Sequence, residues 1–292
     1  WAASDGAVAS GRSNLRFHVS HGGSLRGRLR LPGDKSISHR AIMLGALAEG
    51  ITEVTGFLEG TDSLATIAAF KNMEVKIDGP RGGRVTIRGV GLHGLHEPAA
   101  ALDLGNSGTS MRLLSGLLAG QAFSVTLTGD ESLNKRPMRR VTDPLALMGA
   151  DIASSADGTA PLRITPAAGL KGLEYEMPVA SAQVKSCLLL AGLYTNGETC
   201  VTEPAPTRDH TERMLTAFGY PVHRDGAKAC VKGGGRLTAC RLDIPADISS
   251  AAFFLVGASV APGSDLVLEH VGVNPTRVGV LDILHAMGAD IE

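Results

Sequence analysis

One arrangement of motifs occurs four times along this chain. Each copy starts with a short strand and a polar turn, and continues with a small-residue apolar helix, a β-rich run and an amphipathic helix. The amphipathic helices end at Met73, Met148, Phe218 and Met287, which are 75, 70 and 69 residues apart. Self-similarity at a nearly fixed period is typical of folds built from repeated units. The repeat therefore predicts an α/β fold made of strand–helix units.

The parts of each copy recur in the same order. The strand-and-turn segments are residues 29–36, 102–109, 175–182 and 242–249. The apolar helices are expected at 41–48, 111–119, 184–193 and 251–260, and the β-rich runs at 51–58, 123–128, 198–203 and 265–273. A glycine follows each helix, where a left-handed C-cap position would favour it: Gly50, Gly120, Gly197 and Gly263.

The repeat also predicts how the chain divides into domains. Three complete units cover residues 32–246 and are expected to form one domain. Residues 25–31 and 247–292 are expected to form part of a second domain, with the first strand crossing over to it. Residues 1–24 are rich in Ala, Gly and Ser without periodicity, and are interpreted as a linker or tail.

The two ends of the chain suggest a longer natural protein. The sequence begins at Trp1 rather than Met, so we expect the natural start to be missing or removed. The fourth copy stops at Glu292, five residues past Met287, whereas the first three copies continue into further strand-like sequence. A chain ending inside a unit would leave a strand edge without its neighbour, so we expect a C-terminal continuation.

Composition excludes several classes of partner. The net charge is −1, which gives no general field for nucleic acid or anionic lipid. No apolar run reaches the length of a membrane span, and no signal peptide is visible. We therefore expect a cytoplasmic protein whose four cysteines are reduced thiols. His93 and His96 lie in a glycine-rich turn and are not expected to bind a metal.

The first polar turn combines three groups suited to an anion. Lys35 and Ser36 stand at a helix entrance, and Arg40 follows Ser36 by one helical turn. Helix N-termini bind anions because their free N–H groups and dipole are positive. An ammonium, a hydroxyl and a guanidinium fork could therefore hold one anion. The alternative is a capping serine beside two solvated cations.

Two later turns have the same character. The second, Gly-Asn-Ser-Gly-Thr (105–109), has glycines that allow close approach of a ligand, and Arg112 follows it. The third contains Ser181 and Gln183 at a helix start. Each could also be an ordinary capped turn, and the fourth turn, at 247–250, has no cation and is interpreted as a cap alone. Further cations precede later helices at Lys135-Arg-Pro and Arg208-Asp-His.

Four of these segments together are specific to one family. The runs Leu-Pro-Gly-Asp-Lys-Ser-Ile-Ser-His-Arg (31–40), Gly-Asn-Ser-Gly-Thr (105–109), Lys-Arg-Pro-Met (135–138) and Ser-Ala-Gln-Val-Lys (181–185) resemble the EPSP synthases, 3-phosphoshikimate 1-carboxyvinyltransferases. The resemblance covers residues 25–292, and the run at 208–212 is similar to class II members. It implies an inside-out barrel of βαβαββ units, three in each of two domains. Class II members are often tolerant of glyphosate. Gly108, in contrast, leaves room for that inhibitor where some tolerant enzymes have alanine, so the resemblance does not assign glyphosate sensitivity.

The resemblance also implies substrates and binding residues. The family transfers the enolpyruvyl group of phosphoenolpyruvate to the 5-hydroxyl of shikimate 3-phosphate. The residues expected to bind shikimate 3-phosphate are Lys35, Ser36, Arg40, Ser181, Ala182 and Gln183. Those expected to bind phosphoenolpyruvate are Lys35, Gly108, Arg136 and Gln183. Ala182 replaces a serine found in many members, so only its backbone N–H could serve there.

Some expectations concern what this chain lacks. The family's proton-transferring carboxylates match no residue here, so the chain alone is expected not to turn over. The resemblance implies no cofactor and no metal, and we expect a monomer. One alternative is the related enolpyruvyl transferase that acts on a UDP-sugar, although no cysteine lies in the loop before Lys135. Another alternative is a non-catalytic phosphosugar-binding chain.

Overall fold

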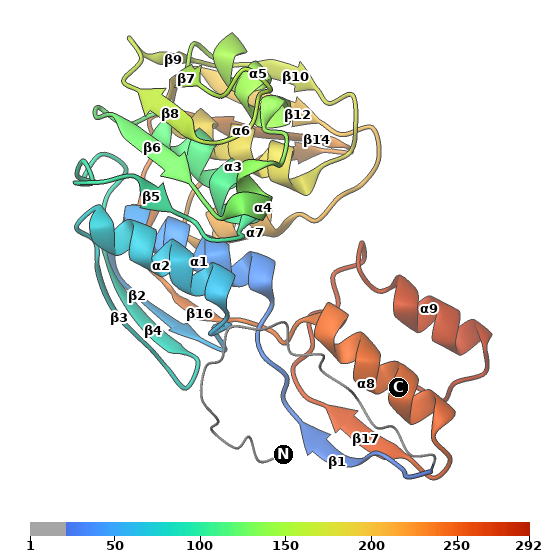
Figure 1. Ribbon diagram of the computed structural model, residues 1–292. Helices are drawn as coiled ribbons and strands as arrows, with labels where there is room; N and C mark the ends of the chain where they lie inside the picture. The colour runs from blue at the N-terminus through green and yellow to red at the C-terminus, as the bar shows by residue number, and fades with distance from the viewer. Residues whose placement is uncertain (1–21) are drawn as a thin grey trace.

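The computed structural model describes residues 22–292 and has a mixed α/β fold with helices at its centre (Figure 1). The central helices are α1 (Lys35–Leu47), α3 (Gly108–Leu118) and α6 (Ala182–Gly192). Nearly every residue of α3 and α6 is buried, as are the last ten of α1. A helix that is apolar on all sides belongs in a core, which explains the small apolar residues of the repeated helices.

Three sheets with one strand order surround these helices. In each sheet the first strand is parallel to the second, and the next two pairings are antiparallel. The first sheet, in spatial order, has β16 (Arg241–Asp243), β2 (Ala48–Thr55), β4 (Arg84–Val90) and β3 (Lys76–Arg81). The second has β5 (Leu102–Asp103), β6 (Val125–Thr128), β8 (Leu162–Thr165) and β7 (Asp151–Ala153). The third has β10 (Glu174–Glu176), β12 (Glu198–Thr202), β14 (Lys228–Lys232) and β13 (His223–Asp225).

Two short pairings supplement the three sheets. Strand β15 (Leu237–Thr238) also pairs with β2, and β9 (Leu170–Lys171) pairs with β11 (Thr195–Asn196). None of the sheets in residues 22–292 closes into a barrel on its own. The predicted α/β repeat is confirmed by the threefold recurrence of one sheet order.

The amphipathic helix of each copy ends where the sequence predicts. These helices are α2 (Thr61–Asn72), α5 (Arg139–Leu147), α7 (His210–Ala217) and α9 (Gly279–Ala286). Their C-caps are Met73, Met148, Phe218 and Met287. The first three of these side chains are fully buried, whereas Met287 is 75% exposed. A short extra helix, α4 (Glu131–Asn134), precedes α5 and was not predicted.

The strands before the first and fourth copies exchange places. Strand β1 (Arg26–Leu29) precedes α1 but pairs with β17 (Asp265–Leu268), which follows α8 (Ile248–Val260). Strand β16 precedes α8 but pairs with β2 after α1. Figure 1 shows β1, β17, α8 and α9 to one side of the three sheets. A separate small apolar cluster lies in this part: Leu31, Ala246, Ile248 and Ala251.

The prediction of left-handed glycine C-caps is wrong for all four helices. Gly50, Gly197 and Gly263 do have positive φ, but each lies two or more residues beyond the helix end. Gly120 has no positive φ, and a Cβ there would lie 2.2 Å from the ring of Tyr194. The glycines therefore shape the turns into the next strands, and at Gly120 the requirement is space.

The expectation of four reduced cysteines is also wrong. Cys200 and Cys230 form a disulfide with sulfur atoms 2.10 Å apart, while Cys187 and Cys240 are free. The antiparallel register of β12 and β14 places residue 200 directly opposite residue 230. A spacing of 30 residues gives no sign of this register, because it depends on the strand pairing.

Two further predictions concern the N-terminal tail and membrane-spanning helices. Residues 22–24 have no regular secondary structure, and the rest of the predicted tail lies outside the described residues. Within 22–292, no helix is long and apolar enough to cross a membrane.

Candidate functional site

The first polar turn presents an ammonium and a hydroxyl at the start of α1. The Asp34 carboxylate caps the helix by accepting from the Ile37 N–H at 2.8 Å. The Lys35 side chain is 51% exposed, with Nζ 3.1 Å from a carboxylate oxygen of Asp62. The Ser36 hydroxyl accepts from an Arg208 guanidinium nitrogen at 3.0 Å. Both groups lie where the helix dipole is positive.

Arg40 lies beneath this turn rather than beside it. It is only 4% exposed, and it donates to the Ser36 carbonyl oxygen at 2.8 Å. Its Nε donates to the Thr211 hydroxyl at 2.7 Å, and its second terminal nitrogen donates to the Ser186 hydroxyl at 2.6 Å. From the sequence, the Arg40 guanidinium was expected to lie on the same face of the helix as Lys35 and Ser36. In the structure this side chain is buried, and three of its N–H groups donate to protein atoms.

The second and third turns are joined by one side-chain amide. Gln183 accepts at Oε1 from Arg112 at 2.8 Å and donates from Nε2 to the Thr109 hydroxyl at 2.9 Å. The hydroxyls of Ser107 and Ser181 cap α3 and α6, which agrees with the alternative of capped turns that the sequence left open. Because Gln183 belongs to α6 and Thr109 to α3, the two helix starts lie together.

Two guanidinium groups converge above Gly108. A Cβ at this position would lie 2.9 Å from a terminal nitrogen of Arg112 and 3.1 Å from one of Arg136. Arg136 also donates to Asn106 Oδ1, and the Asn106 amide donates to Asp130 at 2.7 Å. Gly108 is the first residue of α3, so the two positive groups stand at the positive end of a helix.

The electrostatics of the three turns show positive groups that disfavour one another's charged form. Burial and the nearby charge of Arg208 lower the pKa of Arg40 to about 10. The pKa of Arg208 is lowered by burial and by Arg277, and that of Arg112 by burial and by Arg136. Like charges that disfavour each other's ionised form are relieved by a bound anion. The arrangement is therefore suited to holding anionic ligands.

Comparison with known proteins assigns this arrangement to a family. The family model for EPSP synthase (3-phosphoshikimate 1-carboxyvinyltransferase) matches residues 19–292. The chain belongs to the EPSP synthase family. It is 70% identical over 278 residues to the 3-phosphoshikimate 1-carboxyvinyltransferase of Alkalilimnicola ehrlichii, and 69% identical over 276 residues to that of Methylococcus capsulatus.

Solved structures agree with this family assignment. An EPSP synthase from Acinetobacter baumannii matches with a TM-score of 0.88 and 60% identity, over 92% of this chain and 62% of that chain. The two curated relatives are matched over 95% and 94% of this chain, but over only 62% and 63% of their own length. The chain thus spans a little over three fifths of the EPSP synthases it resembles.

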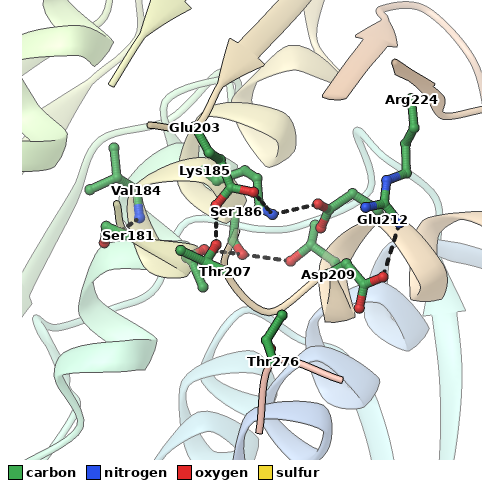
Figure 2. Close-up of polar contacts among 12 residues, drawn as sticks. Ser181, Val184, Lys185, Ser186, Glu203, Thr207, Asp209, Glu212, Arg224 and Thr276 are labelled. Carbon is green, nitrogen blue, oxygen red and sulfur yellow. Dashed lines mark hydrogen bonds and ion pairs between the residues drawn. The ribbon is translucent and has the colours of Figure 1, made fainter. Parts of the chain in front are cut away.

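Within this EPSP synthase family member, the structure reveals a buried ion cluster that the sequence did not. Lys185 is 1% exposed, and its Nζ lies 2.7 Å from both Glu203 Oε2 and Glu212 Oε1 (Figure 2). Thr207 donates a further hydrogen bond to Glu203. The cluster ties α6 to the loop before α7 and to α7 itself. The sequence did contain a signal for this cluster, because Lys185 lies within the apolar run of α6. A lysine that is buried in such a run is expected to be paired with an acidic group.

A second group of polar contacts ties α7 to the part of the chain that follows β17. Asp209 accepts from Arg224 at 2.9 Å (Figure 2). It also accepts from Arg213 and from the Asn274 amide, each at 2.8 Å. Burial opposes the ionised form, but these hydrogen bonds hold the pKa of Asp209 below its usual value. Arg277 from the same segment donates to Ser249, so the fourth turn meets a cation that the sequence did not place there.

His39 connects the helices α1, α2 and α3 beneath the site. Its Nδ1 lies 2.8 Å from the Thr66 hydroxyl and 3.2 Å from that of Ser110, which bring in α2 and α3. Burial first, and then the charge of Arg40, lowers the pKa of His39 to about 4. A neutral histidine is therefore part of the folded structure at neutral pH.

The variant His39→Asn should make the protein less sensitive to acid. Because the pKa of His39 is about 4 in the folded state and near 6.5 unfolded, its stabilising contribution is complete above pH 6.5 and is lost as pH falls to 4. The loss on acidification should be about 3 kcal/mol smaller in the variant. Urea unfolding at pH 7 and pH 4 measures this, with the exposed His96→Asn as control. An equal loss in wild type and His39→Asn would contradict the assignment.

Two surface hollows lie outside the helix starts of the polar turns, although the second reaches Gly33 just before α1. One of about 510 Å³ borders the outer face of β3 and β4 near Lys71, Lys76 and Arg88. The other, of about 460 Å³, lies beside Arg30, Gly56 and Gly83. Neither is lined by Lys35, Gly108 or Gln183, so the candidate site is defined by convergent side chains.

Proposed function

We propose that this chain supplies the substrate-binding turns of a 3-phosphoshikimate 1-carboxyvinyltransferase. That reaction transfers the enolpyruvyl group of phosphoenolpyruvate to the 5-hydroxyl of shikimate 3-phosphate and releases phosphate. The observation that carries the proposal is the convergence of three helix starts with several arginines that lower one another's pKa. Two polyanions must be held together in this reaction, and fixed cations offset their repulsion.

Shikimate 3-phosphate would bind between the first and third turns. Its proposed partners are Lys35, Ser36, Arg40, Ser181, Ala182 and Gln183. Lys35 and Ser36 support this by presenting charged and hydroxyl groups at the start of α1. Arg40 has five N–H donors, of which the described contacts use three, so two remain for a ligand that reaches it.

Phosphoenolpyruvate would bind at the start of α3. Its proposed partners are Lys35, Gly108, Arg136 and Gln183. The lack of a side chain at Gly108 supports this, because a ligand can approach the backbone N–H groups below Arg112 and Arg136. Gln183 would lie between the two substrates, since it contacts both the second and the third turn.

Further proposals concern organisation and setting. We propose that residues 32–246 form one domain, and that 25–31 and 247–292 belong to a second. The β1–β17 pairing and the separate apolar cluster support this division. We also propose a monomeric, cytoplasmic protein without a cofactor. The chain alone should bind substrate without releasing phosphate, because the resemblance assigns the acid and the base to none of its residues.

Calorimetric titration of the purified chain tests the proposal. The chain should bind shikimate 3-phosphate, and Lys35→Ala should weaken that binding about tenfold, because a charge-assisted contact is lost. In chain saturated with shikimate 3-phosphate, Arg136→Ala should weaken phosphoenolpyruvate binding by a similar factor. The controls are Lys71→Ala and Arg139→Ala, which change cations outside the turns. A folded wild-type chain that binds neither substrate would overturn the proposed function.

A further inference from the structure

A row of buried hydroxyls connects the first and third turns through Arg40. Thr211 lies on α7 and Ser186 on α6, and each is 1% exposed. Arg40 donates from Nε to Thr211 and from a terminal nitrogen to Ser186, at 2.7 and 2.6 Å. Thr211 is in turn 2.7 Å from Ser186, and Ser186 is 2.6 Å from the carbonyl oxygen of Ala182.

The hydrogens in this row can point in only one direction. An arginine donates and never accepts, so both hydroxyl oxygens accept from Arg40. Each hydroxyl has a single hydrogen, and a carbonyl oxygen can only accept. The Ser186 hydrogen must therefore go to the Ala182 carbonyl, and the Thr211 hydrogen to Ser186. Both hydroxyl hydrogens are thus used, and the order Arg40, Thr211, Ser186, Ala182 is fixed.

The same guanidinium also holds the first turn. Its remaining terminal nitrogen donates to the Ser36 carbonyl oxygen at 2.8 Å. The backbone at Ser36 and the backbone at Ala182 are thus attached to one rigid, planar group. Hydrogen bonds of this kind are strengthened by burial, because the local dielectric constant is low. The row and the guanidinium thus link the two turns by hydrogen bonds.

We propose that Thr211 and Ser186 are positioning residues that set the spacing of the shikimate 3-phosphate site. The inference rests on the proposed function, in which the Ser36 and Ala182 turns grip the same ligand. Neither hydroxyl is needed to touch the ligand, because each acts through Arg40 and the two turns. Loss of the Thr211 hydroxyl leaves the Arg40 Nε–H without its acceptor and removes one of the two donors to the Ser186 oxygen.

The variant Thr211→Val tests this, since it keeps the shape and removes the hydroxyl. Calorimetric titration of the 292-residue chain with shikimate 3-phosphate should give a Kd about tenfold higher than wild type. Thr211→Ser restores the hydroxyl and should return the Kd to within about twofold. A role in packing alone would give the opposite order, because valine fills the space and serine does not.

Two further variants complete the experiment. Thr199→Val removes a fully buried hydroxyl of β12 that has no hydrogen-bond partner among residues 22–292, and should leave the Kd unchanged. Ser186→Ala breaks the row at its next member and should match Thr211→Val, which keeps the test decisive if the valine variant does not fold. Folded Thr211→Val or Ser186→Ala chains with the wild-type Kd would overturn the inference. A folded wild-type chain without affinity for the ligand would instead overturn the proposed function.

Discussion

Replacing Lys185 with methionine should lower the free energy of unfolding by about 3–5 kcal/mol, because two buried carboxylates lose the ammonium that they share. Glu203 keeps its hydrogen bond from Thr207, but Glu212 has no hydrogen bond within residues 22–292 and depends on the ammonium 2.7 Å away. Methionine has nearly the same length as lysine, so packing is largely kept. Urea unfolding at pH 7, followed by far-ultraviolet circular dichroism, measures the change.

A second lysine provides the matched control for this prediction. Lys135 also pairs with a glutamate, Glu131, but both side chains are more than 70% exposed. An exposed pair contributes about 0–1 kcal/mol, so Lys135→Met should have little effect. Adding Glu203→Gln and Glu212→Gln to Lys185→Met should recover much of the loss, because the uncompensated charges are removed. Equal effects of Lys185→Met and Lys135→Met would contradict the buried ion cluster.

Substituting Gly116 with alanine should destabilise the protein by about 3 kcal/mol. This glycine lies where α3 packs along α6, and a Cβ there would be 2.0 Å from the Cys187 carbonyl oxygen. Backbone atoms cannot move aside as a flexible side chain does, so the two central helices would have to separate. The measurement is again urea unfolding at neutral pH, with the change in midpoint converted by the common slope.

Gly279→Ala is the control for the substitution itself. Gly279 is also a helical glycine, the first residue of α9, but a Cβ there would meet no atom within 4 Å. Alanine favours helix by up to about 1 kcal/mol over glycine, so this variant should be neutral or slightly stabilised. Similar losses in both variants would mean that helix separation is not the cause.

The parts of the fold that recur in each copy could be predicted from the sequence. The turns, the apolar helices and the terminal Met73, Met148 and Phe218 recur with one spacing, so each copy supports the interpretation of the others. Lys35 and Gly108 are found in the predicted turns because helix starts are set by local capping chemistry. Such features depend on residues close in sequence, so they can be predicted without knowing the tertiary contacts.

What could not be predicted depends on contacts between distant segments. Arg40 looks like an exposed partner of Ser36 in sequence, yet its acceptors Thr211 and Ser186 lie 171 and 146 residues away. The disulfide of Cys200 with Cys230 depends on the register of β12 and β14 in the same way. The inward direction of Arg40 follows only once α6 and α7 are packed beside α1.

The exchange of β1 and β16 has a consequence for synthesis on the ribosome. Thr55 in β2 pairs with Asp243 in β16, 188 residues later. At ordinary rates of translation, β2 waits about 10 to 40 s for this neighbour to emerge. Throughout that interval one edge of β2 is open to pairing with other nascent chains. The first unit therefore keeps an open strand edge during most of synthesis, although it is made early.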